Sequence, residues 1–202
     1  MRAASDYMPG ETAMQIAFLR EAFEGPRRKL HIYTTNYDDL LEVALEASPK
    51  LAELGYSTVL PYTGPDDDDD PDELHIKVRH LHGFLGRSGS KGSLTLTERS
   101  YFGEAAKREW QYQEVVHELT HNSCLFLGTS LTDLNIVRYL HEHGGKKRHA
   151  IVFVREAEIY DVPEHVREAR ERVAIDRWGS ERLDVVFVDH YADVAQLILE
   201  IA

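Results

Sequence analysis

Residues 124–154 read CLFLGTSLTDLNIVRYLHEHGGKKRHAIVFV, and this stretch decides the fold. Its first four residues, CLFL, are a short continuous apolar run that predicts a buried strand. Residues 133–143 then carry apolar side chains at helical spacing up to a Gly-Gly pair, and 150–154 (AIVFV) form a second apolar run. Short apolar strands that alternate with helices indicate a parallel sheet covered by helices on both faces.

The same alternation extends in both directions along the chain. Toward the C-terminus, the pattern predicts a helix over 163–175 with Pro in its first turn, a strand over 183–188 (LDVVFV) and a helix over 191–201. Toward the N-terminus, the predicted elements are helices over 12–23, 38–47 and 104–120 and strands over 30–34 and 74–81. Pro49 is expected to end the helix over 38–47. We therefore predict a single α/β, Rossmann-like domain over residues 1–202.

Residues 56–73 interrupt the alternation, and we predict an irregular acidic loop there. The run of five aspartates at 66–70 supports this interpretation, because adjacent carboxylates repel one another and cannot share a packed face.

Composition excludes several classes of function. The formal net charge of −12 opposes binding to a phosphate backbone, and the short basic cluster at 146–149 is best explained as a solvated turn. The single cysteine, Cys124, cannot form an internal disulfide or a four-cysteine zinc module. The sequence shows neither a secretory signal nor an apolar run long enough to cross a bilayer. We expect a cytoplasmic protein that contacts neither membrane nor nucleic acid.

Polar residues and glycines follow the predicted strands, at the edge where parallel α/β sheets bind their ligands. Thr35, Asn36 and Asp38 follow the strand over 30–34, and His82-Gly83 follow the strand over 74–81. The other two clusters are Gly128-Thr129-Ser130 after CLFL and Asp189-His190-Tyr191 after LDVVFV. Any one cluster can be a turn or a helix cap, but four clusters in register with the strands favour a binding site.

Three blocks make the sequence similar to a known family. TTNYDDLLE at 34–42, HLHGFLG at 80–86 and LFLGTSLTDLNI at 125–136 resemble, in order and spacing, the sirtuin-like superfamily of NAD-binding domains. The likeness is greatest to its zinc-free branch, which is associated with prokaryotic defence proteins that hydrolyse NAD. It extends weakly to the DHYADV segment at 189–194.

The resemblance implies a role for each polar cluster. Asn36 would position the nicotinamide ribose and the attacking water, and His82 would act as the general base. Asp38 would help to hold the nicotinamide end, and Thr35 and Gly83 would be further cofactor-binding residues. Gly128, Thr129 and Ser130 would lie against ribose and phosphate, and Asp189 and Tyr191 would border the adenine.

The activity that the resemblance implies is hydrolysis of NAD to nicotinamide and ADP-ribose without a metal. The chemistry suits these side chains, because an amide and an imidazole can orient a water and accept its proton at neutral pH. A homo-oligomer or a partner defence protein would fit the same context. Two other roles stay open, namely a nucleotide-sensing or assembly module without catalysis and, less favoured, an NAD-dependent protein deacylase.

The sequence departs from the family in two places. The family's first strand and its Gly-rich phosphate loop have no counterpart before Leu30, so we expect an incomplete chain, a lost phosphate loop or a strand supplied by another chain. A sheet without that strand would leave two strand edges open or close differently. The family also often has an asparagine near the end of the AIVFV strand, where this chain has Val154 and Arg155.

A rival motif lies at 117–121. The residues His117, Glu118 and His121 match the His-Glu-x-x-His pattern of zinc peptidases, and Glu142 could be proposed as a third ligand. The motif ends where a helix is predicted to end, so its histidines could simply interact with the last helix carbonyls. We rank a metallopeptidase below an NAD hydrolase.

Overall fold

The computed structural model describes residues 13, 14, 16, 30–53, 58–63, 75–87, 89–91, 94, 110–129, 131, 133–143, 147–155, 163–179 and 183–201. The chain forms two compact units. Unit 1 comprises 1–102 with 195–202, and unit 2 comprises 103–194.

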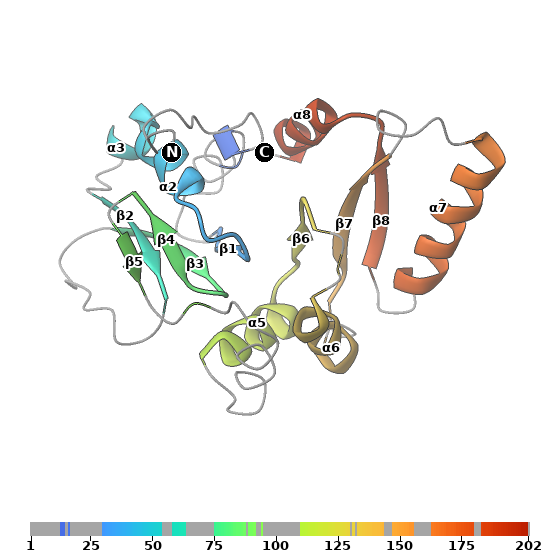
Figure 1. Ribbon diagram of the computed structural model, residues 1–202, viewed down its shortest axis with the longest axis horizontal. Helices are drawn as coiled ribbons and strands as arrows, with labels where there is room; N and C mark the ends of the chain where they lie inside the picture. Colours follow the sequence, from blue (N-terminus) through green and yellow to red (C-terminus); the bar gives the residue numbers. More distant parts are fainter. Residues whose placement is uncertain are drawn as a thin grey trace. The chain divides into compact units, whose positions relative to one another are not determined.

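Unit 1 contains a three-stranded parallel sheet in the order β1-β3-β2, formed by Ile32–Thr34, His75–His80 and Thr58–Tyr62 (Figure 1). Helices α2 (Leu40–Glu46) and α3 (Pro49–Glu53) accompany the sheet, and α2 contacts β2. The core of the unit is apolar. It consists of Ile32, Ala44, Leu45, Leu51, Val59, Ile76 and Val78.

A short antiparallel hairpin follows β3 and is formed by β4 (Phe84–Gly86) and β5 (Gly89–Lys91). The sequence did not predict this hairpin. Of the helix predicted over 12–23, residues 13, 14 and 16 are described and are helical, and Ala13 and Ile16 pack on the core.

Two predictions in unit 1 were wrong. The stretch predicted as an irregular loop over 56–73 contains strand β2, which pairs with β3 in parallel register. The acidic run at 66–70 lies outside the described residues. Pro49 does not merely end a helix, because α2 stops at Glu46 and Pro49 is the first residue of α3. The Ser48 hydroxyl accepts a hydrogen bond from the Leu51 N–H at 3.3 Å, so Ser48 caps the second helix.

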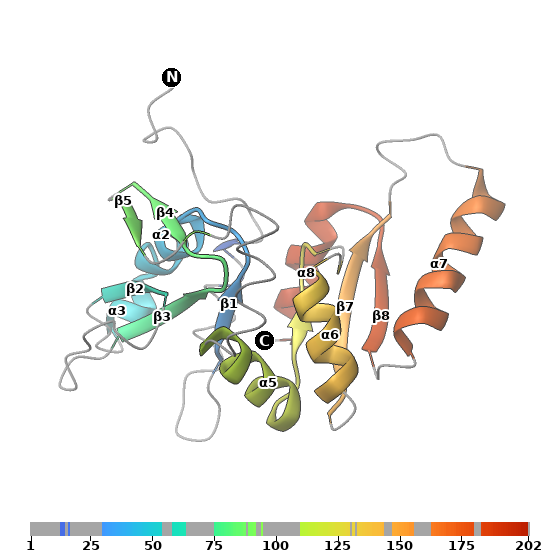
Figure 2. The same cartoon turned by 60° about the horizontal axis from the view of Figure 1, so that its bottom comes forward.

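Unit 2 contains a second three-stranded parallel sheet, in the order β6-β7-β8. Its strands are Leu125–Phe126, His149–Val154 and Leu183–Val188. Helix α5 (Trp110–His121) packs on α6 (Leu134–His143), and α7 (Glu164–Gly179) runs along β8, as Figures 1 and 2 show. Helix α8 (Tyr191–Ile201) follows β8 directly and has the predicted bounds; it begins in unit 2, and its residues from 195 onward belong to unit 1. The prediction of an α/β fold with parallel strands and intervening helices is confirmed.

Among the described strands, β1 pairs only with β3, and β6 pairs only with β7, so each is an edge strand of its sheet. None of the described helices is both long and apolar enough to cross a membrane.

Candidate functional site

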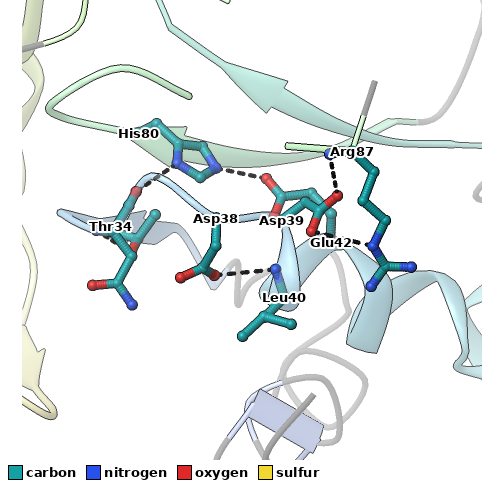
Figure 3. Close-up of polar contacts among 8 residues, drawn as sticks. Thr34, Asp38, Asp39, Leu40, Glu42, His80 and Arg87 are labelled. Atoms are coloured by element: carbon teal, nitrogen blue, oxygen red, sulfur yellow. Dashed lines mark hydrogen bonds and ion pairs between the residues drawn. The ribbon is translucent and has the colours of Figure 1, made fainter. Parts of the chain in front are cut away.

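The loop that follows β1 carries Asn36 at the carboxyl end of the unit 1 sheet. The side chains of Thr35, Asn36 and Asp38 are exposed there. The Asn36 N–H donates to the Thr34 hydroxyl at 3.0 Å, and the Leu40 N–H donates to the Asp38 carboxylate at 3.2 Å (Figure 3). Asp38 therefore satisfies the first N–H of α2 while remaining accessible to solvent.

The loop after β3 lies against the loop after β1. The Leu81 N–H donates to the Thr34 carbonyl at 2.9 Å, and the Leu85 N–H donates to the Tyr37 carbonyl at 2.6 Å. This second loop contains both His82, which is half-buried, and Gly83, which is buried and has a φ of 89° that favours glycine. The structure thus brings Thr35, Asn36, Asp38, His82 and Gly83 together on two neighbouring loops of unit 1.

An ion pair connects the β4–β5 hairpin to the residue that precedes α2. The Arg87 N–H donates to the Asp39 carboxylate at 2.9 Å, and the Arg87 guanidinium lies 3.6 Å from the other carboxylate oxygen (Figure 3). The carboxylate of Asp39 is thereby used for tertiary structure and does not cap α2.

Of the two histidines in this region, His80 at the end of β3 is buried, whereas His82 is half-buried. The His80 side chain is 0% exposed, and its Nδ1 lies 2.9 Å from the carbonyl oxygen of Asn36. Its Nε2 lies 2.7 Å from the Oε1 of Glu42, which is itself 5% exposed (Figure 3). The His80 ring also meets the Phe84 ring edge-on, with centroids 4.9 Å apart. Neither His80 nor Glu42 was predicted to belong to the site. The sequence contains one indication that His80 is buried. In a strand, residues 76, 78 and 80 point to the same face, so His80 shares the buried face of Ile76 and Val78.

The loop after β6 in unit 2 has a tightly defined backbone. Gly128 is exposed at a φ of 61°, and the Thr129 hydroxyl accepts the Leu131 N–H at 3.1 Å. The Asp133 carboxylate accepts the N–H groups of Asn135 at 2.9 Å and Ile136 at 3.1 Å, so this side chain already caps α6. Ser130, the third residue predicted to lie against ribose and phosphate, is outside the described residues.

At the ends of β7 and β8, Asp189 belongs to a charge network. Its Oδ1 accepts a hydrogen bond from the Arg155 guanidinium at 2.9 Å, and this bond lowers the pKa of the Asp189 carboxyl below its ordinary value. The Nε of Arg155 also donates to Glu171 at 2.7 Å. Arg155, which follows β7, therefore binds two carboxylates. Tyr191 is the first residue of α8, and its side chain is not among those described.

The His-Glu-x-x-His motif lies on α5 and serves the end of that helix. The Nδ1 of His121 donates to the His117 carbonyl at 2.9 Å, and the two rings stack with centroids 4.4 Å apart. The Glu118 carboxylate accepts a hydrogen bond from the Asn122 amide at 2.7 Å. Across the described part of the chain, no group of three or more His, Cys, Asp or Glu side chains is placed to hold a metal ion.

Two residues near β6 are withdrawn from solvent, Cys124 in part and His149 almost completely. Burial raises the pKa of the Cys124 thiol to about 12, with a further contribution from the charge of Glu118. The prediction of a solvated turn at 146–149 was wrong for His149, which is 2% exposed and accepts the Cys124 N–H at its Nδ1. The nitrogen that accepts this bond carries no proton.

These features define an α/β protein with polar loops at the carboxyl ends of parallel strands, the class of fold that binds dinucleotides at that edge. Comparison with known protein families makes the assignment more specific: the SIR2-like domain family matches residues 30–179, about three quarters of the 202-residue chain. The chain belongs to the SIR2-like family, and its function is of the sirtuin type and related to NAD. No curated protein matches the chain.

Proposed function

We propose that this chain hydrolyses NAD to nicotinamide and ADP-ribose. The observation that carries the proposal is the placement of Asn36 in unit 1. Its side chain is exposed at the carboxyl end of β1, while hydrogen bonds hold its backbone on both sides. The neighbouring loop, joined to this one by backbone hydrogen bonds, carries His82.

Breaking the bond between nicotinamide and ribose develops positive charge on the ribose. In our proposal, the Asn36 amide orients the ribose and the attacking water, and the His82 imidazole accepts the proton of that water. An imidazole suits this step because it exchanges a proton near neutral pH. Since backbone hydrogen bonds join the two loops that carry these groups, the proposed reaction would need little rearrangement of the loops.

The other contacts of the proposal follow from the polar clusters. Asp38 would help to hold the nicotinamide end, and Thr35 and Gly83 would bind the cofactor beside it. Gly128, Thr129 and Ser130 would lie against ribose and phosphate. Asp189 and Tyr191 would border the adenine. Because Asp189 is bound to Arg155 and Arg155 to Glu171, this cluster would offer the adenosine end a fixed acceptor rather than a mobile carboxylate.

The test is nicotinamide release from NAD, followed by liquid chromatography with the purified chain. We expect Asn36→Ala and His82→Ala each to lower the rate at least about a hundredfold while the thermal unfolding midpoint stays near that of the wild type. The matched controls are Asn122→Ala and His165→Ala, which remove an exposed amide and an exposed imidazole of unit 2 and should leave the rate unchanged.

A wild-type chain that binds NAD without releasing nicotinamide would contradict hydrolysis and favour a nucleotide-sensing module. A rate that survives either substitution would remove that residue from the mechanism.

On the resemblance to prokaryotic defence proteins, we further propose that this activity depletes NAD in infected cells. Expression of the wild-type chain, but not of Asn36→Ala, should then lower the plating efficiency of phage on a bacterial host. Equal plating efficiencies for the two would contradict a defence role.

A further inference from the structure

We infer that His80 and Glu42 form a buried positioning pair that sets the direction of the Asn36 side chain. The inference rests on the proposed function, since it concerns the residue that would orient ribose and water. His80 contacts the Asn36 backbone and, in the described residues, does not reach the exposed edge where substrate would bind. It is therefore a positioning residue and not a catalytic one.

Hydrogen-bond chemistry fixes the orientation of the His80 ring. A backbone carbonyl can only accept, so the Nδ1 that faces the Asn36 carbonyl must carry a proton and donate it. The Nε2 and the Glu42 carboxylate then share a hydrogen bond at 2.7 Å. Turning the ring over would place carbon atoms against both the carbonyl and the carboxylate, and both bonds would be lost. The pair therefore permits only one ring orientation.

The two contacts connect three separate elements. His80 ends β3, Asn36 lies in the loop after β1, and Glu42 lies in the first turn of α2. Because the Asn36 N–H is also bound, to the Thr34 hydroxyl at 3.0 Å, both peptide groups that flank the Asn36 Cα are fixed. The side chain then leaves the backbone in a defined direction although it is exposed. Placement to within about 1 Å decides rates by about a hundredfold in enzymes, so this is an effect large enough to measure.

Two substitutions at position 80 separate the two bonds. The amide nitrogen of Asn lies as many bonds from the Cβ as Nδ1 does, so His80→Asn can still donate to the Asn36 carbonyl. The amide nitrogen of Gln matches Nε2, so His80→Gln can still bind Glu42 but leaves the carbonyl without its donor. Both variants lose the ring contact with Phe84, which makes each the control for the other.

We expect His80→Gln to lower kcat for nicotinamide release about a hundredfold with little change in KM, and His80→Asn to stay within about tenfold of the wild type. The loss should fall on kcat because Asn36 acts at the reacting end of the substrate. Equal losses in the two variants would mean that His80 supports only stability, and a wild-type kcat in His80→Gln would overturn the inference.

A second pair of variants covers the case in which position 80 does not tolerate change. Glu42→Gln keeps a hydrogen-bonding partner for Nε2, whereas Glu42→Met keeps the size and removes the partner. We expect a lower kcat in Glu42→Met that Glu42→Gln largely restores, and identical kcat values in the two would overturn the inference.

Hydrogen exchange distinguishes failure of the inference from failure of the proposed function. If the wild type releases no nicotinamide, amide exchange of residues 34–39 still reports whether the loop is held. Exchange there should be faster in His80→Gln than in His80→Asn. The same exchange in both variants would overturn the positioning role whatever the chain does to NAD.

Discussion

The buried His80–Glu42 pair should show strong thermodynamic coupling, which a double-mutant cycle can measure. Glu42 is only 5% exposed, and its Oε2 has no hydrogen-bond partner among the described residues. His80→Leu would also remove the imidazole from Oε1, so that neither oxygen of this buried carboxylate would be hydrogen-bonded. Removing one member of a buried ionic pair costs about 3–5 kcal/mol. Glu42→Met should cost less, about 1–3 kcal/mol, because it leaves only one imidazole nitrogen unsatisfied.

The double variant is the decisive one. With both side chains apolar, neither position buries a polar side chain, and the site resembles the surrounding core of Ala44, Leu45 and Val78. We therefore expect the double variant to be more stable than the sum of the single effects predicts, by about 2–3 kcal/mol.

The assay is urea unfolding of the four proteins, followed by far-UV circular dichroism. Both tryptophans, Trp110 and Trp178, belong to unit 2, so tryptophan fluorescence reports on that unit, and hydrogen exchange of the β3 amides reports on unit 1. Similar m-values would show that the variants change stability rather than the extent of unfolding. Additive single effects, within about 0.5 kcal/mol, would refute the reasoning, because they would mean that His80 and Glu42 do not depend on each other.

Two further predictions follow from groups with shifted pKa values. Because the pKa of Cys124 is raised to about 12, its thiolate fraction at pH 8 should be on the order of a thousandfold below that of the unfolded chain. Iodoacetamide should therefore modify Cys124 only after denaturation. Rapid modification of the folded chain would contradict this prediction. The lowered pKa of Asp189 means that its bond to Arg155 adds stability above the ordinary aspartate pKa and loses it as the pH falls through the lowered value. Asp189→Asn should therefore lower the thermal unfolding midpoint slightly at pH 7, by less in high salt and not at all at acid pH. If the midpoints of the wild type and the variant differ by the same amount at every pH, the charge of Asp189 is not involved.

The elements that the sequence located well are those with strong periodicity. β8 and α8 have the predicted bounds, and β7 differs from its prediction by one residue. A continuous apolar run marks each of the two strands, and helical spacing of apolar residues marks the helix. β2 was missed for a physical reason. Its sequence, TVLPY, contains Pro61, which argues against a central strand, but β2 is the edge strand of its sheet, where proline is tolerated.

The candidate site was predictable only in part. Polar residues that follow strands can be found in a sequence, because the strand ends are marked by the apolar runs before them. Partners that approach from distant elements cannot, and this is why the bond from Arg155 to Asp189 across two strand ends was not foreseen. The same holds for Glu42 and His80, which lie 38 residues apart and meet only after α2 and β3 have packed.

The requirements of one carbonyl explain why a hydrogen-bonded polar pair occupies this core. The Asn36 carbonyl faces the end of β3, and a side chain that donates to it from there must bury its remaining polar atoms as well. A histidine has a second nitrogen pointing onward, so it needs a further partner, and Glu42 provides one from the first turn of α2, where a carboxylate also interacts favourably with the helix dipole. An apolar pair of the same volume could be as stable, but it would leave the Asn36 carbonyl without a donor. The buried pair is thus explained by the direction that it gives to Asn36 rather than by the stability that it adds.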